Sequence, residues 1–160
     1  MDYYGEMASG YDLLHGAEQQ KKYAFIRAII GSASDTWKIL DVGAGTGIGL
    51  SYFENISGLE PSAKMIYEYH GSKTLIQGTA ENLPFPDHSF DLIISVTALQ
   101  NFADARMALR EMKRVSKRYA ISFLKRSQKR EELLNAITEV LGPGRIEEGE
   151  IDLYYFNLGQ

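Results

Sequence analysis

The chain has 160 residues, of which 44% are hydrophobic and 24% charged, with a formal net charge of −4 and no cysteine. This length and composition predict one domain with a buried core, and the lack of cysteine excludes disulfides, thiolate metal sites and cysteine nucleophiles. The acidic balance disfavours a broad nucleic-acid-binding surface. Asp2 and Glu6 precede any apolar run, and no run reaches the length of a membrane span, so we expect a cytoplasmic protein without a signal peptide.

The first 30 residues are expected to lie outside the core fold. Residues 1–16 are rich in tyrosine and glycine and show little periodicity, so they form either a loosely packed tail or a lid over a ligand. Residues 17–30 carry apolar side chains at three- and four-residue spacing, which predicts a helix with one apolar face. Gly31 is expected to end this helix.

The stretch 37–49, WKILDVGAGTGIG, combines an expected strand with a glycine-rich turn. Its apolar run predicts a strand buried on both faces, with Asp41 near the carboxyl end. Gly43, Gly45 and Gly47 remove side chains where the backbone turns sharply at the ligand-binding edge of a sheet. The dinucleotide fingerprint fails in both registers because its third glycine is absent, and the phosphate loop fails because no lysine follows the last glycine.

The pattern D-x-G-x-G-x-G resembles the first motif of class I S-adenosylmethionine-dependent methyltransferases. That cofactor carries an ammonium and a sulfonium group, and an acid at Asp41 suits such cations, directly or through water, but would repel a phosphate. The resemblance implies that the cofactor contacts Asp41, Gly43, Ala44 and Gly45. We also expect a short helix from about Gly47 to Phe53, capped by the hydroxyl of Thr46.

The next segment predicts a second strand at 56–60 that leads into a helix. Glu60 ends the strand, and Pro61 favours the first turn of a helix. An acid at this place can accept hydrogen bonds from both hydroxyls of a ribose, because a carboxylate has two oxygens. The string LEPSAKM resembles the family's second motif, which implies that Ser62 and Met65, with Pro61, lie near the adenosine.

A third strand is expected at 73–77, followed by the string GTAENLPFPD. This string resembles the adenine loop of the same family. The resemblance implies that Thr79 accepts a hydrogen bond from the adenine amino group and that the amide of Ala80 serves the neighbouring ring nitrogen. Thr79 stands where the family often has aspartate, so the charge is missing here.

A fourth strand is expected at 89–95, and the following stretch from Val96 should enter the ligand crevice. In the family this stretch borders cofactor and acceptor, which makes Val96 a cofactor contact and Gln100 a substrate-side candidate. Histidine often stands at the position of Gln100, and glutamine takes no proton at neutral pH, which puts general-base chemistry there in doubt. His15 is the other substrate-side candidate. Tyr11 belongs to a string, YDLL, that resembles a segment packing over the cofactor in many small-molecule methyltransferases.

The remaining chain predicts helices at 103–116 and 129–141, a strand at 118–124 between them, and two strands in the tail from Arg145. The tail turns near residues 148–149 without room for a crossover helix, so its strands must form an antiparallel hairpin. This ending is typical of the class I methyltransferase sheet. We therefore predict a Rossmann-like α/β fold with a seven-stranded mixed sheet, an antiparallel C-terminal hairpin and helices on both faces.

The sequence thus predicts a single methyltransferase domain over 1–160, with a lid segment and helix at 1–30 and a core fold at 37–158. The expected cofactor is S-adenosylmethionine, with S-adenosylhomocysteine as product, and the expected acceptor is a small molecule, without a metal ion. Because no inserted substrate cap is visible, a non-catalytic or partner-activated cofactor-binding subunit remains an alternative, and a homodimer or protein partner could close the site. Glycine spacing and the hairpin disfavour an NAD-dependent oxidoreductase.

Overall fold

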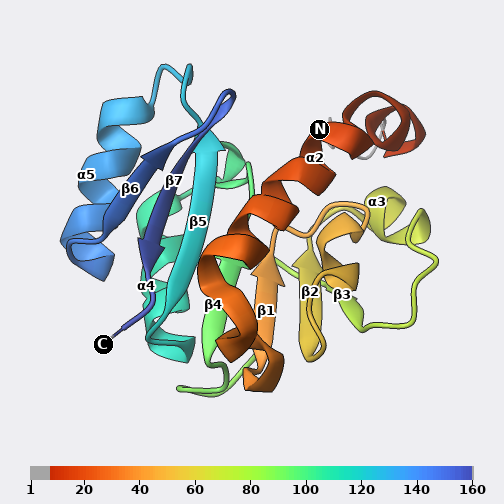
Figure 1. Ribbon diagram of the computed structural model, residues 1–160, viewed down its shortest axis with the longest axis horizontal. Helices are drawn as coiled ribbons and strands as arrows, with labels where there is room; N and C mark the ends of the chain where they lie inside the picture. Colours follow the sequence, from red (N-terminus) through yellow and green to blue (C-terminus); the bar gives the residue numbers. More distant parts are fainter. Residues whose placement is uncertain (1–7, 160) are drawn as a thin grey trace.

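The computed structural model describes the backbone of residues 8–159 and the side chains of residues 15–159. This part of the chain forms one seven-stranded sheet with the order β3-β2-β1-β4-β5-β7-β6 (Figure 1). The strands are β1 (Ile39–Val42), β2 (Ile56–Glu60), β3 (Leu75–Gln77), β4 (Leu92–Ser95), β5 (Tyr119–Leu124), β6 (Arg145–Glu148) and β7 (Asp152–Asn157). Strands β1 to β5 pair in parallel, whereas β7 runs antiparallel to β5 and β6. The predicted mixed sheet with its terminal hairpin is confirmed.

The central strands are apolar because both of their faces are covered. Strands β1 and β4 are buried along their whole length and pair with each other. Side chains alternate between the two faces of a strand, so Ile39 and Asp41 point to one side of β1 while Leu40 and Val42 point to the other. The side chain of Asp41 is thereby buried on the same side of the sheet as Ile39, at the carboxyl end of β1.

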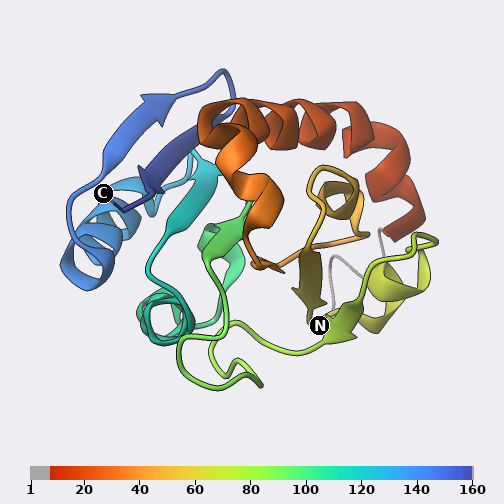
Figure 2. The same cartoon turned by 60° about the horizontal axis from the view of Figure 1, so that its bottom comes forward.

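Helices cover both faces of this sheet (Figures 1 and 2). The helical segments are α2 (Ala8–Ile30), α3 (Ala63–Tyr67), α4 (Ala105–Val115) and α5 (Arg130–Leu141), with the 3-10 turns η1 (Gly31–Thr36), η2 (Ile48–Ser51) and η3 (Leu99–Asn101). Helix α2 crosses one face, where Ile26 packs in a core with Ile39 and Ile94. Helices α4 and α5 share the core on the other face, which includes Leu40 and Ile93.

The two helices behind the sheet follow their predicted periodicity. The buried hydrophobic positions of α4 recur every three or four residues: Ala108, Leu109, Met112 and Val115. The helix starts where the Asp104 carboxylate accepts a hydrogen bond from the amide of Met107 at 3.0 Å, which satisfies one of the free amides of the first turn. Helix α5 ends at Gly142, whose φ of 88° lies in the left-handed region that glycine adopts without strain.

The helix predicted after the glycine stretch was wrong in length and in its cap. The segment is the 3-10 turn η2, and Gly47, not Thr46, stands at its N-cap position without a side-chain cap. Gly47 has a φ of 86°, and a Cβ there would lie 2.3 Å from the ring of Tyr69. The chain therefore needs glycine at this turn for conformation and for space.

Two other helix starts differ from the prediction. The N-terminal helix was expected from residue 17 but begins at Ala8, because its first turns follow no apolar period that the sequence could reveal. Helix α3 begins after Ser62 rather than at Pro61, and the Ser62 hydroxyl accepts a hydrogen bond from the amide of Met65 at 3.3 Å. Residues 1–7 of the expected lid lie outside the described residues.

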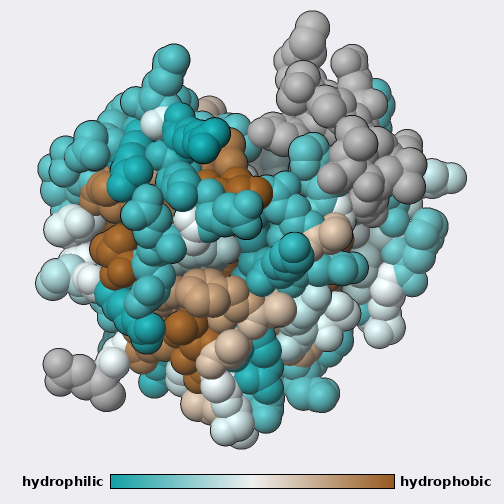
Figure 3. All heavy atoms as spheres, turned by 45° about the horizontal axis from the view of Figure 1, so that its top comes forward, coloured by the Kyte–Doolittle hydropathy of each residue, from teal (hydrophilic) through white to brown (hydrophobic). Residues whose placement is uncertain are grey.

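The surface at the carboxyl ends of the parallel strands is mixed in character. Figure 3 shows apolar patches separated by hydrophilic side chains on this side of the molecule. The exposed large apolar side chains of the described residues include Phe25, Leu124, Ile146 and Ile151. Scattered exposed apolar residues are usual for a folded domain. Within the described part of the chain, no helix combines the length and the apolar character needed to cross a membrane.

Candidate functional site

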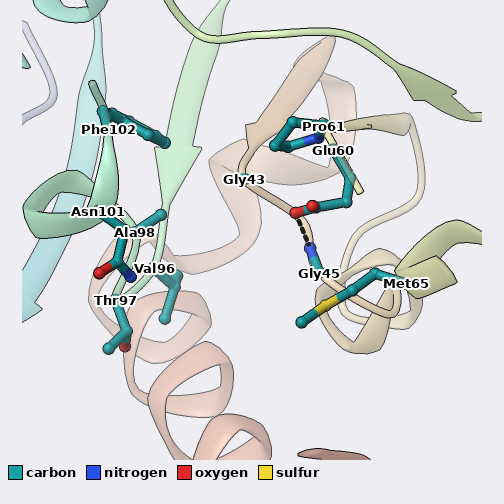
Figure 4. A pocket seen from close by; sticks show the side chains of 10 residues that line it. All are labelled: Gly43, Gly45, Glu60, Pro61, Met65, Val96, Thr97, Ala98, Asn101 and Phe102. Carbon is teal, nitrogen blue, oxygen red and sulfur yellow. Dashed lines mark hydrogen bonds between the residues drawn. The ribbon is translucent and has the colours of Figure 1, made fainter. Parts of the chain in front are cut away.

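A pocket opens at the carboxyl ends of β1, β2 and β4 (Figure 4). It is lined by Gly43, Gly45, Glu60, Pro61, Met65, Val96, Thr97, Ala98, Asn101 and Phe102. One wall comes from the glycine turn, the end of β2 and helix α3, and the other comes from the chain between β4 and α4. Figure 4 shows the two groups of side chains facing each other across the pocket, with Gly43 between them. This is the edge at which open α/β sheets bind ligands.

The glycine turn contributes bare backbone to its wall of the pocket. The amides of Gly43 and Ala44 donate to the carbonyl of Leu59 at 2.8 and 3.0 Å, which fixes the turn against β2. Gly43 has a φ of 80°, and a Cβ there would lie 2.7 Å from the Cβ of Ala98. The two walls of the pocket therefore meet at Gly43, where a side chain would separate them.

Glu60 is held at the junction of the glycine turn and α3. One carboxylate oxygen accepts a hydrogen bond from the amide of Gly45 at 3.0 Å, and the other accepts from the amide of Ser62 at 2.8 Å. The residue is 7% exposed, and hydrogen bonds from amides to a charged acceptor compensate the burial of its charge. The carboxylate is thus fixed in orientation at the pocket wall, on the side of β2.

Asp41 lies beneath the glycine turn rather than in the pocket lining. Its side chain is fully buried on the α2 side, where the Tyr23 hydroxyl donates to one carboxylate oxygen at 2.7 Å. Burial raises the pKa of Asp41 to about 7; the hydrogen bond from Tyr23 opposes this rise, and the negative charge of Glu60 adds to it. Among the described residues, the other carboxylate oxygen is buried without a hydrogen-bond partner. Such an orphaned acceptor is expected where a ligand or water belongs.

The loop that resembles an adenine loop is held in place by α4. Arg114 donates to the carbonyls of Leu83 and Phe85 at 3.1 and 2.8 Å, and to the Asp87 carboxylate at 2.9 Å. Glu111 accepts from the amide of Leu83 at 2.8 Å and pairs with Arg114. The hydrogen bonds from Arg114 hold the pKa of Glu111 below its usual range. One side-chain pair on α4 therefore sets the course of the loop.

The predicted site residues fall into three groups. Those that line the pocket are Gly43, Gly45, Glu60, Pro61, Met65 and Val96. Those that lie outside the lining are Asp41, Ala44, Ser62, Thr79, Ala80, His15 and Gln100. Tyr11 lies in the first turns of α2, and its side chain is outside the described residues.

Four of the predicted residues that do not line the pocket are either placed in the loop that resembles an adenine loop or contact other residues of the protein. Ala80 is buried and Thr79 is exposed to solvent. His15 faces Glu18 one turn further along α2, with Nδ1 at 3.5 Å from the carboxylate. The Gln100 amide donates to the carbonyl of Thr97 at 2.8 Å, so this side chain supports the loop.

Sequence reasoning placed the stretch after β4 at the crevice but missed its individual contacts. Thr97, Ala98, Asn101 and Phe102 line the pocket there, and the sequence predicted only Val96 of this wall. It also missed Lys22 and Asp152, whose side chains reach Thr97. No local pattern could reveal these two, because they lie near opposite ends of the chain and meet only when α2 and β7 pack on the sheet.

Comparison with known proteins gives matches over most of the chain. A family model described as a methyltransferase domain matches residues 40–124. An uncharacterized protein of Methanocaldococcus jannaschii is 37% identical over 121 residues, which cover 72% of this chain and 47% of that protein. The demethylmenaquinone methyltransferase of Thermotoga maritima is 33% identical over 132 residues, which cover 74% of this chain and 57% of the relative. The chain thus spans about half the length of these curated relatives.

Solved structures support the same architecture. A protein of Methanococcus maripaludis, assigned as an S-adenosylmethionine-dependent methyltransferase, superposes with a TM-score of 0.77 and covers 100% of this chain and 96% of its own, at 17% identity. At that identity the likeness shows the fold alone. The YcgJ protein of Bacillus subtilis is 29% identical, with a TM-score of 0.58 over 65% of this chain and 51% of that one.

Proposed function

The chain belongs to the methyltransferase domain family, within the class I S-adenosylmethionine-dependent methyltransferases, and from this premise we propose that it transfers a methyl group from S-adenosylmethionine to a small molecule. The cofactor would bind in the pocket at the carboxyl ends of β1, β2 and β4. The single observation that carries this proposal is the fixed, nearly buried carboxylate of Glu60 at that pocket.

The geometry at Glu60 suits a ribose. A carboxylate can accept about four hydrogen bonds, and the amides of Gly45 and Ser62 donate one to each oxygen. A vicinal diol can then donate to both oxygens of the same group. An acid at the end of β2 can hold the ribose of NAD as well, so the preference against NAD rests on the missing third glycine of the dinucleotide fingerprint and on the antiparallel hairpin.

Other parts of the pocket fit the rest of such a cofactor. The bare backbone at Gly43 allows close approach of a ligand. Pro61, Met65 and Phe102 provide apolar walls for the adenosine and the carbon chain. The orphaned oxygen of Asp41, below the glycine turn, can accept a hydrogen bond from an ammonium group, whose positive charge would favour the ionised form of the carboxyl. The adenine contacts inferred for Thr79 and Ala80 remain part of the proposal.

The chemistry requires alignment more than acid–base groups. S-adenosylmethionine supplies a methyl carbon that is already activated by its sulfonium. The protein must hold the acceptor in line with that carbon and exclude water, because displacement depends on the orientation of the reacting atoms. The wall from Thr97 to Phe102 faces the glycine turn and would position the acceptor on the side away from Glu60. No described side chain is assigned as a general base.

The acceptor class rests on the relatives and on the pocket. The name of the Thermotoga maritima relative states that it acts on demethylmenaquinone, which makes a small, largely apolar acceptor the first candidate for this chain. The alternative is a cofactor-binding subunit that needs a protein partner for turnover. Turnover of a metabolite panel with and without added cell extract would separate the two.

Isothermal titration calorimetry tests the cofactor. The protein should bind S-adenosylmethionine and S-adenosylhomocysteine and should not bind NAD. Glu60→Ala should weaken binding by about 1.5–3 kcal/mol for each hydrogen bond lost to the charged acceptor. Glu54→Ala, at an exposed acid on the loop before β2, is the matched control and should bind normally. Unchanged affinity in a folded Glu60→Ala variant would remove Glu60 from the ribose site.

A further inference from the structure

Thr97, in the pocket wall after β4, has a backbone conformation that its residue type disfavours. Its φ is 54°, and His88, with a φ of 57°, is the other non-glycine residue with positive φ in the described part of the chain. His88 lies exposed in a turn, where such a conformation is common. Thr97 is β-branched, and for a β-branched residue the left-handed region is a true outlier that the surroundings must impose.

Hydrogen bonds from four directions impose it. The Lys22 ammonium donates to the Thr97 hydroxyl at 2.9 Å, and that hydroxyl donates to the Asp152 carboxylate at 2.6 Å. The Thr97 amide donates to both the carbonyl and the hydroxyl of Ser122, each at 3.1 Å. The Thr97 carbonyl accepts from Gln100 at 2.8 Å. Backbone and side chain of this residue are therefore both fixed.

The centre of this arrangement is a buried ion pair between α2 and β7. Lys22 is 5% exposed and Asp152 is 1% exposed, and their charged atoms lie 3.1 Å apart. Ser122, on β5, donates to Asp152 at 2.7 Å. Buried ion pairs add little to stability on average, because desolvation offsets the attraction, but they can specify one conformation. Here the residue whose conformation they can specify is Thr97.

The conformation of Thr97 decides where the pocket wall stands. Thr97 lines the pocket itself, and the chain leaves it directly into Ala98 and η3, which carries the wall on to Phe102. Ala98 already packs against the glycine turn, since a Cβ added to Gly43 would lie 2.7 Å from the Cβ of Ala98. If Thr97 left its left-handed conformation, the wall from Ala98 to Phe102 would shift. At Gly43 this wall already lies so close to the opposite wall that no side chain fits between them.

We propose that Lys22, Ser122 and Asp152 are positioning residues of the cofactor pocket, which hold Thr97 in its left-handed conformation and thereby set the wall from Ala98 to Phe102. The proposal rests on the function proposed above, because the pocket concerned is the same. It adds that the contact between α2 and β7 affects the affinity for the ligand through the strained conformation of Thr97.

The test removes the charges of Lys22 and Asp152 together, and Glu18, the second carboxylate near Lys22 at 3.6 Å, is partly exposed and stays solvated. The double variant Lys22→Met/Asp152→Asn should remain folded but bind S-adenosylhomocysteine about tenfold more weakly, because Thr97 can leave its strained conformation. Adding Thr97→Gly should restore most of this affinity, since glycine adopts positive φ freely. Adding Thr97→Ala should not, because alanine loses the hydroxyl but keeps the strain. Ile30→Ala, at a buried position further along α2, controls for general destabilisation and should leave affinity unchanged.

A ligand-free measurement separates this inference from the proposed function. Hydrogen exchange of the amides of residues 97–102 should be faster in the double variant than in the wild type, whether or not either protein binds the cofactor. If the wild type binds no S-adenosylhomocysteine but this difference in exchange appears, the proposed function fails and the positioning role stands. Equal exchange would overturn the positioning role, and so, where the wild type binds S-adenosylhomocysteine, would equal affinity of wild type and double variant or equal rescue by Thr97→Ala and Thr97→Gly.

Discussion

Asp41 illustrates how a motif residue can be placed correctly along the chain while the surroundings of its side chain stay unpredicted. The sequence predicted an acid at the end of β1, and the acid is there, but its side chain turns toward α2 because the preceding alternation puts Ile39 and Asp41 on that face. The charge is buried with the Tyr23 hydroxyl as its described donor. Glu60 behaved differently: its place just before a helix start was visible in a contiguous string, and it lines the pocket.

The buried carboxyl of Asp41 predicts a specific pH dependence of stability. Its folded pKa of about 7 lies above the ordinary value of 3.8, so the folded protein keeps a proton that the unfolded protein releases between these pH values. The contribution of this group to stability is fully present below about pH 4 and is lost as the pH rises through 7. The free energy of unfolding of Asp41→Asn minus that of the wild type should therefore increase from pH 4 to pH 7, by up to a few kcal/mol.

Urea denaturation at a series of pH values measures this difference, and contributions from other titrating groups cancel between the two proteins. The asparagine side chain of the variant can still accept the hydrogen bond from Tyr23, so the comparison isolates the loss of the titrating group. A difference that stays flat across this range would show that Asp41 ionises normally in the folded state.

At the scale of elements, helices and strands were predictable wherever the apolar pattern of the sequence repeated over enough residues. Helix α4, helix α5 and the strands of the sheet follow apolar patterns and turn residues, so their positions were predicted within a few residues. Helix α2 was predicted too short and η2 too long, because the periodicity of apolar residues is weak in segments where glycine and tyrosine dominate. The contacts that hold the loop before β4 were not predicted, because Arg114 lies on α4 and is 29 residues away from Phe85 in the sequence.

Arg114 provides the prediction at this scale. Arg114→Leu removes donors to the carbonyls of Leu83 and Phe85 and leaves Glu111 without its cation. We expect faster hydrogen exchange across residues 82–88 and a loss of about 1–3 kcal/mol in the free energy of unfolding. Arg110→Leu, an exposed position on the same helix, should change neither. Slow exchange in the loop of Arg114→Leu would mean that other contacts determine its course.

At the scale of the whole molecule, the sheet order and the two-sided cover follow from the chain's sequence of strands and helices. What could not be predicted is how α2 and β7 meet beside the pocket wall at Thr97. The pairing of α2 with β7 through Lys22 and Asp152 depends on the finished sheet, in which β7 lies between β5 and β6. The glycine turn and the Glu60 side of the pocket are therefore predictable from short motifs, whereas the contacts that hold Thr97 arise only from tertiary packing.

The lid predicted for the N-terminal segment can be tested on the intact protein. If residues 3–14 close over the cofactor, their amides should exchange more slowly when S-adenosylmethionine is added, because closure excludes water from the site. Protection of Gly43–Gly47 in the same experiment is the internal control for binding. Protection at the glycine turn without any change in residues 3–14 would leave an open site that a partner or second copy must cover.

The place of β7 inside the sheet has a consequence for the order in which the protein is made. A ribosome delivers the chain from its amino end, so the glycine turn, Glu60 and Thr97 all emerge before Asp152 does. Until β7 inserts beside β5, that strand presents an unpaired edge and Lys22 lacks its buried counter-charge. We expect nascent chains that end before β7 to assemble the Glu60 side of the pocket first, and cofactor affinity to reach its full value only when β7 has been released.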